Sequence, residues 1–245
     1  MNTFYIKLAD RVFEINAIYD YLSKYCADYI CQPDDNAISI SITEVDIDYE
    51  CAISKKTEEN EGKQVYAHTR AYLETLAAYR KICEILPSYG VFLFHGSAVA
   101  VDGEAYMFTA KSGTGKSTHT RLWREKFGER AVMVNDDKPL IKFENGRAYV
   151  FGTPWNGKHR LSTNACYPLK AICILQRDTY NHIEKISKKE AFPLLMQQSY
   201  RAHDPEALVK IIDLLNRTAE STELFRLGCN MDPEAAEVSY NGMNK

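Results

Sequence analysis

Residues 108–118 have the types and the spacing that best suit chemistry in this chain. They read Phe-Thr-Ala-Lys-Ser-Gly-Thr-Gly-Lys-Ser-Thr, in which a small residue and four spacers precede Gly-Lys-Ser. A loop of this form directs its backbone N–H groups toward a phosphate, and Gly113 and Gly115 favour it because glycine adopts positive φ. We expect Lys116 to reach the β- and γ-phosphates of a nucleotide and Ser117 to bind Mg²⁺. The other residues expected to bind the nucleotide are Ser112, Thr114 and Thr118.

The sequence on both sides of this loop supports the interpretation. Residues 104–109 form a short apolar run that predicts a strand. Downstream, Leu122, Trp123 and Phe127 recur on one face of a helix that Gly128 ends. A preceding strand and a following helix are the context in which a phosphate loop works. The alternative is a glycine-rich turn with an incidental Lys-Ser pair.

Two adjacent acids, Asp136 and Asp137, follow the apolar run 131–134. A carboxylate at the end of a buried strand beside a phosphate loop is where Mg²⁺ is usually held. Neighbours on an extended chain point to opposite sides, so one acid can face the metal while the other faces an acceptor. The alternative is a surface turn with two solvated acids.

His95 and the segment 152–160 complete the set of candidate residues. His95 ends an apolar run, and the hairpin predicted at Asp102-Gly103 returns the chain to the loop, which can bring the histidine to the γ-phosphate. The segment 152–160 is polar and broken, and its Lys158 and Arg160 can meet phosphate charge. A hydrogen-bonded structural histidine and an ordinary basic surface loop are the alternatives.

The hydrophobic pattern predicts an α/β protein with a small N-terminal α/β domain, 1–60, and a core domain, 61–245. The first would hold strands at 4–8, 12–15 and 38–42, a helix at 17–29, and a sheet continuing through Val45, Ile47 and Tyr49. A polar linker is expected at 55–63, followed by a helix at 64–86 that Pro87 ends.

The core is expected to contain a mixed sheet flanked by helices. Its further predicted strands are 131–134, 140–143, 147–151, 169–175 and an edge strand at 224–227, and its further helices are 191–200, 205–218 and a short one from Pro233.

Composition limits the classes of function. The chain has 245 residues, 45% of them hydrophobic and 26% charged, and its formal net charge of -3 gives no electrostatic reason to bind nucleic acid or an anionic membrane. We expect no membrane span and no signal peptide. Seven scattered cysteines without a CxxC pair predict reduced thiols and a cytoplasmic location. The oligomeric state stays open, and a homo-oligomer is compatible with the sequence.

A family resemblance rests on three stretches. His95-Gly96, the loop 110–117 and Asn135-Asp136-Asp137 together resemble the HPr serine kinase and phosphoenolpyruvate carboxykinase group of phosphate-loop proteins. The segments 117–123 and 154–158 are similar to a bacterial branch described as HPr-kinase-like. The resemblance covers about 72–175 and implies a phosphate-loop kinase core of that type. Thr118 stands where HPr kinases normally carry an acid, and the N-terminal unit does not match theirs.

The resemblance also implies roles. Lys116 and Ser117 would bind phosphates and Mg²⁺, Asp136 would be the base and Asp137 a metal ligand, with these two roles exchangeable, and His95 would orient the aspartate or sense the γ-phosphate. The predicted function is an ATP-dependent kinase, with ATP and Mg²⁺ as cofactors. Its acceptor would be a hydroxyl on a peptide, a protein or a small molecule. The alternatives are a nucleotide-sensing binding module and a carboxykinase acting on oxaloacetate.

Overall fold

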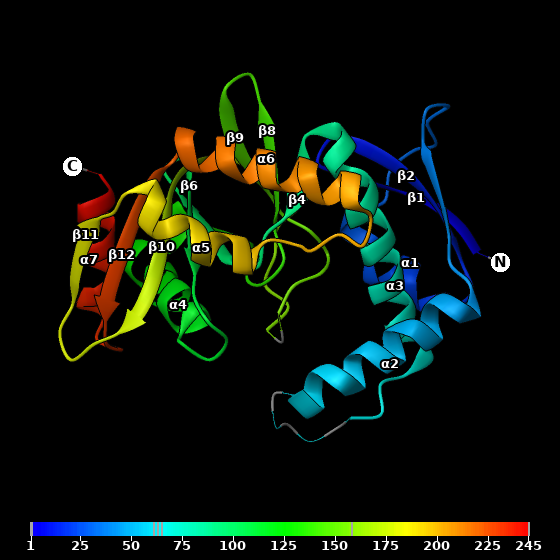
Figure 1. Cartoon of the computed structure of the whole chain (residues 1–245), viewed down its shortest axis with the longest axis horizontal. Coiled ribbons are helices and arrows are strands. Elements are labelled where there is room, and N and C mark those ends of the chain that lie inside the picture. The colour runs from blue at the N-terminus through cyan, green and yellow to red at the C-terminus, as the bar shows by residue number, and fades with distance from the viewer. Residues whose placement is uncertain (1, 61, 63, 65, 158, 245) are drawn as a thin grey trace. The chain divides into compact units, whose positions relative to one another are not determined.

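The structure is a computed structural model that describes residues 2–60, 62, 64, 66–157 and 159–244 (Figure 1). The chain divides into two compact units, Met1–Ile85 and Leu86–Lys245. The sequence had placed the domain boundary after residue 60. The difference arises because the helix α3 (Arg70–Ile85) contacts α1, α2 and β3, all of them elements of the first unit. No helix among the described residues is both long and apolar enough to cross a membrane.

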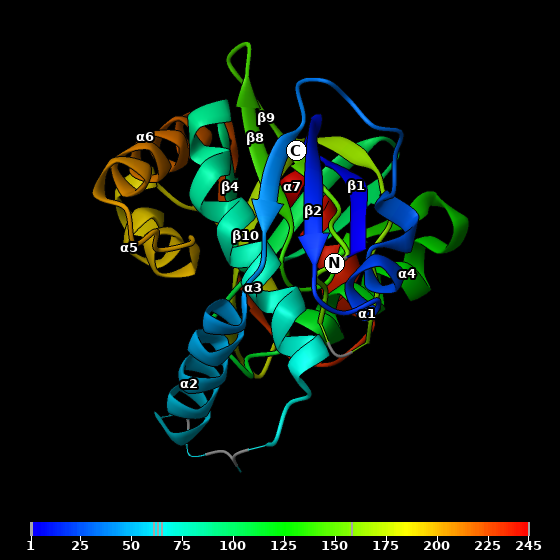
Figure 2. The ribbon, with the colours of Figure 1, turned by 90° about the vertical axis from the view of Figure 1, so that its right-hand side faces the viewer.

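The first unit is built on a three-stranded sheet of order β1-β2-β3 (Figure 2). β1 (Asn2–Leu8) and β2 (Arg11–Ala17) form the expected hairpin, and β3 (Ile38–Ser41) pairs parallel with β2. The helix predicted at 17–29 is wrong in extent. It is replaced by α1 (Tyr21–Tyr25) and a 3-10 turn, Ala27–Tyr29. The buried Glu74 of α3 accepts hydrogen bonds from the backbone N–H groups of Ile18 and Tyr19, which holds these two residues outside the helix.

The helix α2 (Glu44–Asn60) corrects two predictions at once. Residues 45–49 do not continue the sheet, and residues 55–60 are helical rather than a linker, while 61 and 63 lie outside the described residues. These residues are helical because of contacts with a distant segment. The helix α2 is joined to α3 by ion pairs from Arg80 to Glu50 at 2.5 Å and from Lys81 to Asp46 at 2.7 Å. The helix predicted from residue 64 begins only at Arg70, which itself pairs with α2.

The second unit is organised around a nine-stranded mixed sheet that curls. The strand β10 (Cys166–Arg177) is its longest strand and pairs with three others. The first residues of β10 pair antiparallel with β9, and its later residues pair parallel with β6 on one side and β12 on the other. The other strands are β4 (Val91–Leu93), β5 (Ser97–Val101), β6 (Glu104–Thr109), β7 (Ala131–Asn135), β8 (Leu140–Glu144), β9 (Arg147–Phe151), β11 (His182–Lys185) and β12 (Glu223–Cys229).

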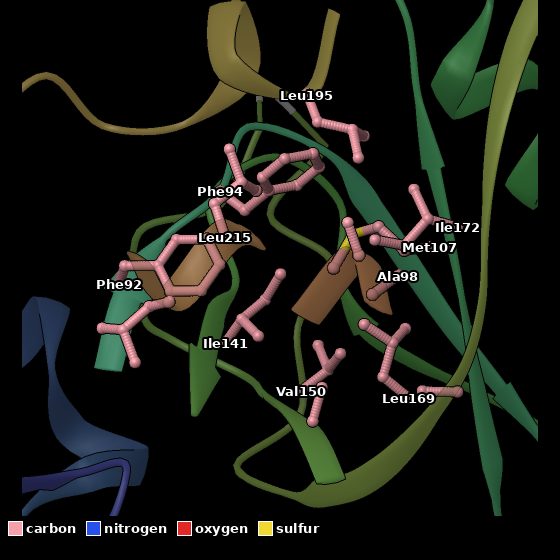
Figure 3. Packing of buried hydrophobic residues seen from close by; sticks show 14 of the residues in the cluster. Phe92, Phe94, Ala98, Met107, Ile141, Val150, Leu169, Ile172, Leu195 and Leu215 are labelled. Atoms are coloured by element: carbon pink, nitrogen blue, oxygen red, sulfur yellow. The ribbon is translucent and has the colours of Figure 1, made fainter. Parts of the chain in front are cut away.

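Helices cover both faces of this sheet because its central strands alternate between two apolar clusters. On one face α5 (Lys188–Gln198) and α6 (Pro205–Ser221) pack on side chains such as Ala98, Met107 and Ile172 (Figure 3). On the other face α4 (Lys116–Phe127) and α7 (Glu234–Met243) pack on the alternate residues, such as Val99 and Phe108. The short 3-10 helices Leu86–Tyr89 and Gly128–Arg130 complete the unit.

Most of the predicted elements of the second unit are confirmed to within a few residues. One is corrected: β12 is not an edge strand, because β11, which the sequence did not predict, pairs with it antiparallel at His182–Lys185. The hairpin at Asp102-Gly103 is confirmed. Both turn residues have positive φ, 53° and 83°, and β5 pairs antiparallel with β6 across it.

The docking of α4 gives a prediction on stability. His119 is buried, accepts a hydrogen bond from the Trp123 indole N–H at 3.1 Å and contacts Ser239 Oγ at 3.1 Å. Burial lowers the pKa of His119 to about 3, so the unfolded chain binds a proton more readily than the folded one. The stabilising contribution is therefore complete above the unfolded pKa of about 6.5 and is lost as the pH falls toward 3.

We expect the free energy of unfolding to fall by about 2 kcal/mol more between pH 7 and pH 5 in the natural chain than in a His119→Phe variant. Phenylalanine preserves an aromatic ring beside Phe108 and removes the titrating group, and the Trp123 N–H retains Ser239 Oγ at 2.9 Å. Urea denaturation at the two pH values measures the difference. Equal pH dependence in the two proteins would show that His119 is not buried in its neutral form.

Candidate active site

The glycine-rich loop lies between β6 and α4, the context that the sequence predicted. Gly113 and Gly115 both have positive φ, 77° and 126°, and no atom lies within 4 Å of where a Cβ would stand on either. Glycine is therefore favoured at both positions because the backbone has positive φ, and not because a larger side chain would clash with its neighbours. Gly115 is the N-cap of α4 and offers no side chain to the first N–H groups of the helix. Those groups are left for an anion.

Lys116 begins α4, and its side chain folds back over the loop. Its Nζ donates a hydrogen bond to the carbonyl oxygen of Ala110 at 3.2 Å. Burial lowers the pKa of Lys116, and the negative charge of Asp137 opposes that shift. Lys116 and Asp137 are thus in electrostatic contact across the site, although 21 positions separate them in the sequence.

Asp137 lies among cationic and hydrogen-bonding groups. His95 Nε2 donates to its Oδ1 at 3.0 Å, and Lys138 Nζ donates to its Oδ2. Burial alone would favour the neutral acid. The hydrogen bond from His95 and the charge of Lys138 outweigh it and hold the pKa of Asp137 well below its ordinary value. The lowered pKa favours the ionised form of this carboxylate, and the predicted residue His95 is its partner.

Asp136 has a different environment, although both acids lie in the bend that follows β7 and not on an extended strand as the sequence predicted. Its side chain is only 4% exposed, and its Oδ1 accepts a hydrogen bond from the backbone N–H of Gly157. Its Oδ2 is buried and has no hydrogen-bond partner among the described residues. Burial raises the pKa of Asp136, the Gly157 hydrogen bond opposes this, and the charge of Asp137 adds to it. An unsatisfied buried carboxylate oxygen of this kind is costly in a folded protein and is typical of functional positions.

Gly157 fits closely against this carboxylate. A Cβ at position 157 would stand 3.0 Å from Oδ2 and 3.2 Å from Oδ1 of Asp136. The backbone at Gly157 thus covers the acid. The predicted site residue Lys158 is the next in the chain and lies outside the described residues.

Asn135 positions both acids, and sequence reasoning assigned it no role. Its side chain is fully buried and makes five hydrogen bonds. Oδ1 accepts from the backbone N–H groups of Asp137 and Lys138, and Nδ2 donates to Thr153 and to the carbonyl oxygen of Trp155. Asn135 therefore fixes the turn that carries the acids and anchors the segment that covers Asp136. The available signal was an asparagine at the buried end of a strand, directly before two acids.

A cavity of about 720 Å³ adjoins these groups. Its walls include the predicted residues Ser117, Thr118 and Asp136, together with His159. A second cavity, of about 480 Å³, is lined by Gly113, Thr114, Gly115 and Thr118. Ser112 is exposed and lines neither cavity. The structure therefore puts loop residues on the wall of the smaller cavity, and the first turn of α4 and Asp136 on the wall of the larger one.

Comparisons with known proteins were made for the whole chain. No protein-family model and no curated protein matches it. Among solved structures, the Hpr(Ser) kinase/phosphatase from Coxiella burnetii is similar at a TM-score of 0.32 and 10% identity, covering 61% of this chain and 94% of that one. This is a distant structural relationship that does not show membership of a family.

Proposed function

We propose that the chain is a kinase that transfers the γ-phosphoryl group of ATP to a hydroxyl. The observation that carries this proposal is the arrangement of two unlike acids beside the glycine-rich loop. Asp137 is held ionised by His95 and Lys138, whereas Asp136 keeps a buried, unpartnered oxygen at the wall of a cavity that the first turn of α4 also lines. Pairs of acids in environments that separate their pKa values typically divide the roles of base and electrostatic ligand.

The phosphate end of the reaction would be held by the loop. The uncapped N–H groups at the start of α4 and the ammonium of Lys116 supply positive charge where the β- and γ-phosphates would lie. Phosphoryl transfer requires little covalent chemistry from the protein, so positioning and electrostatic stabilisation are sufficient.

The acceptor end would be served by Asp136. Its carboxylate takes the proton of the acceptor hydroxyl while the hydroxyl oxygen bonds to the γ-phosphorus. The bond from that phosphorus to the bridging oxygen breaks, and its electron pair stays on ADP. The raised pKa of Asp136 makes it a stronger base than an exposed aspartate. The backbone at Gly157 must move away from Oδ2 for the hydroxyl to reach it.

The donor groups present fit Mg²⁺, which prefers one or two carboxylates together with phosphate oxygens and water. Asp137 is ionised and Ser117 lines the larger cavity, and these two residues would hold the ion. The ammonium of Lys138 would have to release Oδ2 if the ion binds at that oxygen. Bound Mg²⁺ supplies positive charge that offsets the negative charge of the phosphoryl oxygens.

Replacing Lys116 by alanine tests whether the loop binds nucleotide. We expect the affinity for ATP to fall by about 10- to 100-fold, since a hydrogen bond to a charged group contributes about 1.5–3 kcal/mol. Isothermal titration calorimetry with a non-hydrolysable ATP analogue measures the change. Lys126→Ala is the matched control, because Lys126 lies on the same helix and pairs with Glu237. Equal affinities in natural and Lys116→Ala protein would contradict the proposal.

A further inference from the structure

The larger cavity has a wall whose chemistry the proposed transfer does not use. Ser117, Arg121, Arg124 and Gly128 of α4 and the following turn all line it. Residues at this spacing lie along one face of a helix, so the cavity extends from the first turn of α4 toward its C-terminal end. The rest of its wall, outside α4, contains Asp136, His159 and Leu161.

The part of the wall formed by α4 carries two arginines and one acid, Glu125, so its net charge favours an anion. Arg124 is half-buried and makes no ion pair or side-chain hydrogen bond within the described part of the chain. Arg121 pairs with Glu125 at 2.7 Å, but both side chains are more than half exposed, so the pair is weak and readily exchanged for a ligand. An unpaired guanidinium in a cavity is suited to a carboxylate or a phosphate, which it can bind with two parallel hydrogen bonds.

The size of the cavity favours a small molecule. At about 720 Å³ it falls within the range of sites that enclose small ligands. One wall offers the arginines, and the other carries the buried Asp136 carboxylate that lacks a partner for Oδ2. A ligand complementary to both walls carries an anionic group and a hydroxyl.

We infer that the phosphoryl acceptor is a small hydroxylated molecule that also carries a carboxylate or a phosphate, held by Arg124 with help from Arg121. This inference rests on the proposed kinase function, because it names the class of acceptor for that reaction. It assigns to Arg124 a role in binding the acceptor and none in binding the nucleotide.

Binding can be measured without catalysis, using glycerate and glycerol 3-phosphate as anionic probes and glycerol as the neutral one. The Lys116→Ala chain is measured alongside the natural one. A phosphate probe that binds at the glycine-rich loop would lose affinity in this variant, whereas a probe that binds beside Arg124 would not. We expect both anionic probes to bind at least tenfold more tightly than glycerol in both proteins. Comparison of the two anionic probes distinguishes a carboxylate site from a phosphate site.

An Arg124→Gln variant is expected to lose this tenfold preference and to keep its affinity for the ATP analogue. Arg124→Lys should retain part of the preference, which separates loss of charge from a folding defect. Arg217→Gln is the matched control, since Arg217 is half exposed, pairs with Asp213 and does not line the cavity. An anionic probe that binds no better than glycerol would overturn the inference, as would binding that is unchanged in Arg124→Gln.

Transfer assays with γ-labelled ATP complete the test. Preferential labelling of an anionic hydroxylated probe over glycerol supports the inference, and preferential labelling of a serine-containing peptide over all three probes overturns it.

The kinase proposal and the acceptor proposal can fail independently of each other. If Lys116→Ala binds ATP normally, the kinase proposal fails whatever the probes do. If ATP binding depends on Lys116 but the probes show no charge preference, only the acceptor class is wrong.

Discussion

An Asp136→Asn variant is expected to transfer phosphoryl groups about 100 to 10,000 times more slowly than the natural chain, the usual contribution of a general base. Asparagine preserves the shape of the side chain, and its carbonyl oxygen can still accept the hydrogen bond from the Gly157 N–H. It cannot accept the acceptor's proton. The rate is measured with γ-labelled ATP and the panel of hydroxylated acceptors, at saturating nucleotide.

The affinity of Asp136→Asn for ATP should stay within about threefold of the natural value, because the proposal assigns phosphate binding to Lys116 and the loop. The same variant should be more stable near pH 7. Burial raises the pKa of Asp136, so its charged form destabilises the folded state above that pKa, and a neutral amide removes this cost. Greater stability together with lost transfer would separate catalysis from folding.

Asp213→Asn is the control for this experiment, because Asp213 is exposed on α6 and, among the described residues, forms its ion pair with Arg217. Full transfer by Asp136→Asn would show that Asp136 is not the base. If the natural chain binds ATP and labels no acceptor, the nucleotide-sensing module becomes the better explanation. Turnover with oxaloacetate alone would favour a carboxykinase.

The strand–loop–helix around Lys116 was predictable because its signals are local. A short continuous apolar run specifies β6, glycines permit the loop, and the apolar stripe at Leu122 and Trp123 specifies α4. The position of His95 after an apolar run predicted only that the hairpin through Asp102-Gly103 returns it toward the loop, and the family resemblance added an aspartate as its partner. That this aspartate is Asp137 is seen only in the structure.

The rest depended on contacts between distant segments. Residues 45–60 are helical because α3 supplies the charges that neutralise α2, and no window of the sequence contains both helices. Lys138 was not recognised as a partner of Asp137, because a lysine after two acids is also common in exposed turns. The cavity beside Arg124 was not predicted either, since it forms only where α4 faces the segment that contains His159.

Asn135 provides the second large effect that we expect. Alanine at this position should lower the free energy of unfolding by about 3–5 kcal/mol, because it leaves buried and partly buried backbone groups without the Asn135 side chain as their partner, each costing about 1–3 kcal/mol. Among these are the partly buried N–H groups of Asp137 and Lys138 and the carbonyl oxygen of the buried Thr153. Urea denaturation measures the loss. Asn156→Ala is the control, because the Asn156 side chain donates one hydrogen bond, to Ser162 Oγ at 2.8 Å.

Stability alone would not show that Asn135 positions the acids, so the kinetic parameters decide. Within the described residues, the Asn135 side chain hydrogen-bonds to residues 137, 138, 153 and 155 and to none of the glycine-rich loop, and it sets the backbone that carries Asp136 and Asp137. In the folded fraction of Asn135→Ala we therefore expect kcat to fall at least about tenfold, while the affinity for the ATP analogue changes little. This combination indicates that an interaction needed in the transition state, and not in nucleotide binding, has been lost. Loss of stability with an unchanged kcat would reduce Asn135 to a structural residue. A stability within about 1 kcal/mol of the natural chain would instead contradict the hydrogen-bond network itself.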